Sequence, residues 1–205
     1  MKPNEIERKS FAIIDEEAGD HGYPADQWPI VRRMIHTTAD FEYIADTRIH
    51  PQAVAAGIDA IRSGNAIFTD TNMARVGIRQ HQLEPFGGQV RCLMADERIA
   101  RIAAEKGITR AKAAVDAVAD RLDNGIYVVG NAPTALLRLI ELIRQSQTRP
   151  ALVVGLPVGF VNAAESKAEL LDLDTPYITN VGRKGGSNVA AAVVNALIIQ
   201  ARSDG

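Results

Sequence analysis

The sequence has little cysteine, few aromatic residues and almost no net charge. Of its 205 residues one is cysteine (Cys92), 5% are aromatic, and the net charge is −2. A single cysteine excludes a disulfide within the chain and a cysteine-cluster metal site, and it is typical of a reducing compartment. A net charge near zero provides no overall field that would attract nucleic acid. An anionic ligand would therefore have to be held by local arginines and backbone amides.

Long hydrophobic runs are also missing. Residues 1–7 contain no apolar core of a signal peptide, and no apolar run approaches the roughly 20 residues that span a membrane. We therefore expect a cytoplasmic protein without membrane association. With 46% hydrophobic and 23% charged residues, the composition is ordinary for a globular protein. The length suits a single α/β domain over residues 1–205.

The two common phosphate-binding motifs are absent. No turn reads G-x-G-x-x-G. The stretch 182–187 is not a Walker loop, because Lys184 precedes the paired glycines and is not followed directly by Ser or Thr. The histidines have no spacing typical of a metal site. The sequence therefore supports neither a nucleotide cofactor nor a protein-bound metal.

Short apolar runs alternate with helical patterns through the last two thirds of the chain. Runs rich in Val and Ile at 126–130, 151–155 and 177–181 predict strands, each followed by a helical pattern of about a dozen residues. Two earlier runs, 66–69 and 89–94, also predict strands. This alternation favours right-handed crossovers. We expect an α/β fold: a doubly wound, mainly parallel sheet with helices on both faces and the N-terminal helices packed against it.

Three of the predicted strands end in glycine-rich turns, at 130–135, 155–160 and 182–187. Ligands of parallel sheets collect at the carboxyl ends of the strands, and free N–H groups at a helix start attract anions. The third turn adds two cations, Arg183 and Lys184, which would suit a carboxylate or a phosphate. A tight strand-to-helix connection explains the glycines of any single turn equally well.

One histidine stands in a row of ionisable residues. Asp26 as N-cap and Pro29 in the first turn predict a helix, on which Arg32, His36 and Asp40 would form one row if the helix extends that far. A cation, an imidazole and a carboxylate in a row can set the acidity of a histidine that transfers protons. Taken alone, the row is better explained as a solvated stripe of charges with a bystander histidine.

Six segments of the chain, in this order, resemble the precorrin-8X methylmutase family of cobalamin biosynthesis. The segments are 7–14, 33–41, 130–136, 155–161, 164–167 and 182–190. The resemblance covers nearly the whole chain. Within the second segment, residues 37–40 are similar to the branch of the family that acts on cobalt-containing intermediates.

The resemblance implies an isomerase that moves a methyl group from C-11 to C-12 of a tetrapyrrole, precorrin-8X or cobalt-precorrin-8. This 1,5-sigmatropic shift gives hydrogenobyrinate or cobyrinate and needs no cofactor. The family's catalytic histidine falls on His36, and its serine close to the substrate falls on Ser10. The resemblance also implies a homodimer with the substrate near the subunit interface.

These observations combine into one hypothesis about the site. His36 donates and recovers a proton, with Arg32 or Asp40 tuning it. Polar groups at the sheet edge and near His36 hold the substrate, which carries several carboxylates. The expected substrate contacts are Ser10, Arg32, Thr37, Asp70, Asn131, Thr134, Arg183, Lys184 and Ser187. For Asp70, a turn or helix cap is a slightly better explanation than a direct role.

Two other classes of protein share parts of this pattern. A corrinoid-binding or carrier protein would keep the anion-holding turns but would need no proton donor. A nucleotide-dependent oxidoreductase or methyltransferase on the same architecture would have to bind its cofactor. Product formed from substrate identifies an enzyme, and binding of NAD, NADP or S-adenosylmethionine would identify the nucleotide-dependent class.

Overall fold

The computed structural model describes residues 3–203. It contains a six-stranded sheet with the strand order β1-β6-β5-β4-β2-β3. Five strands run parallel, and only β1 pairs antiparallel, with β6. The strands are β1 Thr47–Ile49, β2 Ile67–Thr69, β3 Val90–Cys92, β4 Ile126–Val129, β5 Leu152–Gly155 and β6 Tyr177–Asn180. The predicted mainly parallel sheet is confirmed.

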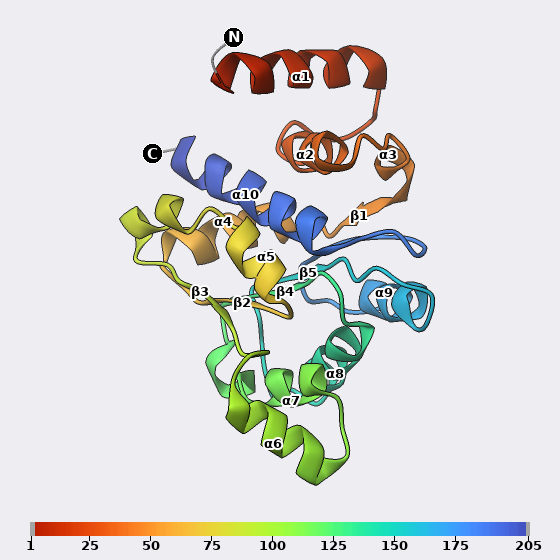
Figure 1. The fold of residues 1–205 in the computed structure, drawn as a ribbon. Coiled ribbons are helices and arrows are strands. Elements are labelled where there is room, and N and C mark those ends of the chain that lie inside the picture. The colour runs from red at the N-terminus through yellow and green to blue at the C-terminus, as the bar shows by residue number, and fades with distance from the viewer. Residues whose placement is uncertain (1–2, 204–205) are drawn as a thin grey trace.

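Helices cover both faces of this sheet (Figure 1). On one side lie α2 Trp28–Thr38, α4 Ala53–Arg62, α5 Asn72–Gly77 and α10 Ser187–Ser203. On the other side lie α6 Glu97–Lys106, α7 Arg110–Asp116, α8 Pro133–Arg144 and α9 Ala163–Leu171. The first helix, α1 Pro3–Ala18, packs on α2 as the outermost element, and α3 Tyr43–Asp46 follows α2. The short 3₁₀ helices are η1 Gln80–Gln82, η2 Glu84–Phe86 and η3 Ala119–Arg121.

The strands separate two hydrophobic cores because successive side chains point to opposite faces. In β4, Ile126 and Val128 enter the core beneath α10, whereas Tyr127 and Val129 enter the core against α8. All four are buried, which explains why the run is apolar throughout rather than alternating. Because most of α10 is also buried between α2 and the sheet, the N-terminal helices rest on the C-terminal helix.

The chain reverses its direction of travel across the sheet between β2 and β4. From β2 it crosses to β3 at one edge, and it then returns to β4 on the other side of β2 and continues to β5 and β6. Ligands of open parallel sheets usually bind at the carboxyl ends of the strands beside such a reversal. Among residues 3–203, no helix has the length and apolarity needed to span a bilayer.

The sequence did not predict β1, the antiparallel strand at the edge of the sheet. Its three residues pair with β6 in the register Thr47 with Asn180 and Ile49 with Ile178. Three residues are too few to show an alternating pattern, and the pairing joins segments more than 120 positions apart. Only the tertiary structure provides the partner of this strand.

Candidate active site

His36 lies in the last turn of α2. The helix buries Ile30, Val31, Met34 and Ile35 against the core, as their helical spacing predicts, and this leaves His36 on the exposed side. Pro29 lies in the first turn, where its missing N–H is harmless.

The predicted N-cap of this helix is wrong, and the helix does not extend to Asp40. Gln27 rather than Asp26 occupies the N-cap position, and no side chain caps the helix. The helix ends at Thr38, because Ala39 adopts a left-handed conformation (φ 54°) and donates its N–H to the carbonyl of Ile35. Asp40 therefore lies beyond the helix.

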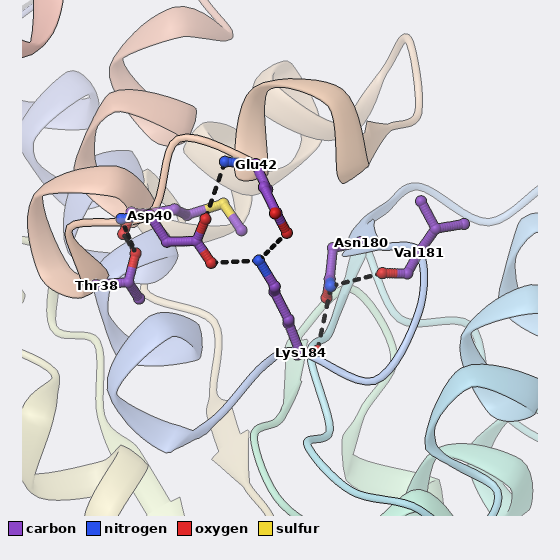
Figure 2. Close-up of polar contacts among 7 residues, drawn as sticks. Thr38, Asp40, Glu42, Asn180, Val181 and Lys184 are labelled. Atoms are coloured by element: carbon purple, nitrogen blue, oxygen red, sulfur yellow. Dashed lines mark hydrogen bonds and ion pairs between the residues drawn. The ribbon is translucent and has the colours of Figure 1, made fainter.

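The predicted row of Arg32, His36 and Asp40 does not form. The guanidinium of Arg32 pairs with Asp15 of α1 at 2.7 Å, and Asp40 pairs with Lys184 of the loop before α10 (Figure 2). The imidazole of His36 instead meets the ring of Phe11 edge-on, with 5.1 Å between the ring centroids. Packing against α1 therefore restricts the orientation of the imidazole.

Two cavities, each of about 310 Å³, have His36 in their lining. The first lies between α1 and the end of α2, and its other lining residues include Ser10, Ile13, Ile14, Ile35, Ala39 and Phe41. The second lies among α1, α2, α5 and α10, and its lining includes Glu7, Arg33, Thr37, Gly77, Arg79 and Asn188. Ser10 and Thr37, both predicted site residues, thus lie beside His36. Cavities of about 460 and 510 Å³ elsewhere have no histidine in their lining.

The second cavity contains a cluster of charges that the sequence did not single out. The carboxylate of Glu7 lies 3.2 Å from Arg33 and 3.8 Å from Arg79. Burial lowers the pKa of Arg33, and the nearby Glu7 opposes that shift. Glu7 and Arg33 lie inside the segments of family resemblance, which were the only signal that could have pointed to them. Arg79 had no signal beyond its charge.

Asp70 is almost fully buried and binds the chain itself. Its carboxylate accepts the N–H groups of Gly130, Asn131 and Ala132 at 2.7–2.8 Å, beside the reversal between β2 and β4. Burial raises the pKa of Asp70, and these three hydrogen bonds oppose that shift. The amides of the first glycine-rich turn, which the sequence offered as free donors for a substrate anion, are therefore occupied by an internal carboxylate.

Three more predicted contacts lie near this turn. Asn131 belongs to the turn itself, Thr134 lies in the first turn of α8, and Ser187 is the first residue of α10. Ser187 is buried, and its hydroxyl lies 2.7 Å from that of Thr71. Asn131 is exposed, and Thr134 accepts a hydrogen bond from Thr109. None of the three lines either His36 cavity.

The cations of the third turn have different surroundings. Arg183 is exposed, with its guanidinium 5.6 Å from the ring centroid of Phe160. The ammonium of Lys184 binds Asp40 and Glu42 (Figure 2). The backbone of this turn is tied to the second turn, since the N–H of Gly159 donates to the carbonyl of Arg183 and that of Gly186 to Leu156. The third turn therefore connects β5, β6 and the end of α2.

Within the described part of the chain, no group of three or more His, Cys, Asp or Glu side chains is arranged to hold a metal ion. Cys92 is half-buried and forms no disulfide. The site around His36 thus consists of an exposed imidazole, a nearby hydroxyl, and arginines paired with a carboxylate. This set can transfer a proton and bind anionic groups.

Comparison with known proteins agrees with this arrangement over nearly the full length. The family model described as precorrin-8X methylmutase matches residues 5–200. Cobalt-precorrin-8 methylmutase from Priestia megaterium is 47% identical, covering 99% of this chain and 90% of that protein. The protein of the same name from Leptospira interrogans is 46% identical, covering 95% and 92%.

A solved structure is similar as well. The crystal structure of precorrin-8X methylmutase from Thermus thermophilus superposes with a TM-score of 0.92 at 48% identity and covers 98% of each chain. Family model, relatives and fold agree. The chain belongs to the precorrin-8X methylmutase family.

Proposed function

We propose that this isomerase of cobalamin biosynthesis moves a methyl group from C-11 to C-12 of its tetrapyrrole substrate, with His36 as the proton donor and acceptor. The observation that carries the proposal is the position of His36. Its imidazole is exposed, it has Phe11 against its ring, and it lines two cavities, one of which also contains Ser10.

The chemistry suits such a site. A 1,5-sigmatropic shift needs the macrocycle held in a reactive conformation and a proton that makes the conjugated system electron-poor. Neither requirement calls for a nucleophile, a redox cofactor or a bound metal. Proton transfer by a positioned side chain typically accelerates a reaction by about 10²–10⁴-fold, and His36 is the one histidine in the lining of the two cavities.

We propose that the substrate's carboxylates meet the arginines near His36 and the exposed Arg183. Arg33 and Arg79 both pair with the carboxylate of Glu7, so two positive charges face one negative charge there. Ser10 and Thr37 add hydroxyls on the two sides of His36.

The other predicted contacts are less well placed for a direct role. Asp70, Lys184 and Ser187 bind other parts of the chain, and Arg32 pairs with Asp15. We therefore assign them to shaping the site. Asn131 and Thr134, which line neither His36 cavity, remain proposed substrate contacts.

We propose a cobalt-containing substrate. Support comes from residues 37–40, which resemble the cobalt branch, and from the names of the relatives in Priestia and Leptospira. The test is turnover of cobalt-precorrin-8 and of metal-free precorrin-8X under identical conditions. Faster turnover of the metal-free substrate would contradict the assignment.

We also propose that the chain is a cytoplasmic homodimer built from one domain. Four apolar side chains are 69–84% exposed: Met73, Val76, Phe160 and Val161. Phe160 and Val161 are adjacent in the chain, and contiguous exposed apolar patches are typical of surfaces that a partner covers. Sedimentation should give twice the mass of one chain, and Phe160→Asp with Val161→Asp should shift the protein towards the monomer. A wild-type monomer would contradict the dimer.

The decisive experiment replaces the imidazole without changing its size greatly. His36→Gln should lower the rate of corrin formation, followed by absorbance, by about 10²–10⁴-fold while product binding persists. His81→Gln is the matched control, because His81 is exposed on η1 and lines neither His36 cavity. A wild-type rate for His36→Gln would remove His36 from the mechanism. Binding without turnover by the wild-type protein would instead indicate a corrinoid carrier.

A further inference from the structure

Lys184 joins two segments that are far apart in the sequence. Its ammonium, on the loop before α10, donates hydrogen bonds to the carboxylates of Asp40 and Glu42, which follow α2 (Figure 2). The hydrogen bond from Lys184 lowers the pKa of Asp40. The ammonium therefore has two carboxylate partners within the chain itself before any substrate arrives.

The segment that Lys184 binds forms part of the His36 site. Ala39 and Phe41 line the same cavity as His36 and Ser10. The N–H of Asp40 donates to the hydroxyl of Thr38 at 3.3 Å, and that hydroxyl donates to the carbonyl of Met34 at 2.8 Å. The position of residues 39–42 is thus connected directly to the last turn of α2, which carries His36.

The loop that carries Lys184 is held from its other side by a buried lysine. Lys167 of α9 is only 1% exposed, and its ammonium donates to the carbonyl of Lys184 at 2.6 Å and to the side-chain oxygen of Asn180 at 3.2 Å. Asn180 in turn donates to the carbonyl of Lys184 at 3.1 Å. Next to it, a Cβ on Gly185 would lie 2.3 Å from the carbonyl oxygen of Leu156. The loop therefore has a defined place from which Lys184 can hold residues 39–42.

We propose that Lys184 is a positioning residue of the His36 site. Its bridge to Asp40 and Glu42 holds residues 39–42 and, through them, the His36 turn of α2 and one wall of the cavity. This role replaces direct binding of a substrate carboxylate, because two of the three N–H donors of the ammonium are already bonded to Asp40 and Glu42. The kinetic part of this inference rests on the proposed function, whereas the structural part does not.

The first experiment needs no substrate. In Lys184→Met, the amides of residues 39–43 should exchange hydrogen about tenfold faster than in the wild-type protein. Of the four histidines, His36 should show a shifted ¹⁵N resonance, and the other three should not. Lys112→Met is the matched control, because Lys112 pairs with Glu141 between α7 and α8, on the other face of the sheet. Unchanged exchange in residues 39–43, or an unchanged His36 resonance, would overturn the proposal.

The second experiment is a double-mutant cycle on turnover. Lys184→Met should lower kcat about tenfold with less than a twofold change in KM, and Asp40→Asn combined with Glu42→Gln should do the same. Combining all three should lower kcat no further, because both changes remove the same bridge. Lys184→Arg should restore most of the rate. Additive losses, or an effect confined to KM, would indicate direct substrate binding and overturn the proposal.

The two proposals can fail separately. If His36→Gln turns over at the wild-type rate while Lys184→Met still loosens residues 39–43, the role of His36 is wrong and the bridge holds. If His36→Gln is inactive while Lys184→Met leaves exchange, the His36 resonance and kcat unchanged, the role of His36 holds and the positioning role is wrong.

Discussion

The carboxyl edge of the sheet and the layer of α1 and α2 both contain predicted site residues, but the structure uses them differently. At the sheet edge, beside the reversal between β2 and β4, the buried carboxylate of Asp70 accepts three backbone N–H groups. In the helical layer, His36 is exposed beside two cavities. In this family member the position that ligands usually occupy in doubly wound folds is filled by the protein itself.

This difference separates stability from activity. Asp70 and Ser187 at the sheet edge should affect mainly the free energy of unfolding, because their side chains bind other parts of the chain. His36 should affect mainly turnover, because within residues 3–203 its imidazole packs on Phe11 and makes no hydrogen bond. His36→Gln should therefore change the free energy of unfolding by no more than about 0.5 kcal/mol. A larger destabilisation would show that His36 also contributes to the stability of the fold.

The largest effect on stability is expected at Asp70. Asp70→Ala leaves three N–H groups without their acceptor and should lower the free energy of unfolding by about 3–4 kcal/mol, measured by urea denaturation. Asp120→Ala, at an exposed position on η3, should change it by less than about 0.5 kcal/mol. If Asp70→Ala is stable but no longer binds the corrin product, Asp70 belongs to the ligand site and the comparison fails.

A smaller loss is expected where the first glycine-rich turn passes α10. A Cβ on Gly130 would lie 2.6 Å from the Cα of Ser187, so Gly130→Ala must push two backbones apart and should cost about 1–3 kcal/mol. Gly88→Ala is the matched control, since its Cβ would meet only the side chain of Leu83 at ordinary distances of 3.5 Å or more. Equal stabilities of the two variants would show that the turn is loosely packed.

The pH dependence of stability should reflect the buried Lys167. Burial lowers the pKa of Lys167 from its ordinary 10.5 to about 8. Between these values the unfolded chain binds the proton and the folded protein does not, so stability should rise with pH over this interval. The free energy of unfolding of the wild-type protein, relative to Lys167→Met, should therefore increase between about pH 8 and pH 10. A constant difference would mean that Lys167 stays protonated in the folded protein.

Much of the fold was predictable because its information is local. Runs such as residues 126–130 are too apolar to lie at a surface, and the helical pattern predicted after residues 177–181 corresponds to α10. The pairing of β1 with β6 and the burial of Asp70 were not predictable as contacts, since each joins positions 60 or more apart. An aspartate that accepts backbone N–H groups of a turn cannot be distinguished in the sequence from an aspartate that is free to bind a ligand.

The candidate site, like the fold, contains residues that the sequence predicted and contacts that it did not. His36 and Ser10 came from the family resemblance, and they lie beside one cavity. The row of Arg32, His36 and Asp40 was wrong because it required the helix to pass Thr38, whereas Ala39 ends it. Lys184 was expected to bind a substrate carboxylate, and in the structure its ammonium pairs with Asp40 and Glu42. Charge could be read from the sequence, but the partner of each charge could not.

By itself, the sequence determined the family, the alternation of strands and helices, and the histidine most worth mutating, because apolar periodicity and local motifs lie within a few neighbouring residues. Only the tertiary structure decided which polar groups remain free for a ligand. Hydrogen bonds and ion pairs form between whichever groups the fold brings within about 3 Å, and here it brought Asp70 to the turn after β4 and Lys184 to the end of α2. His36, by contrast, was left exposed beside its cavities.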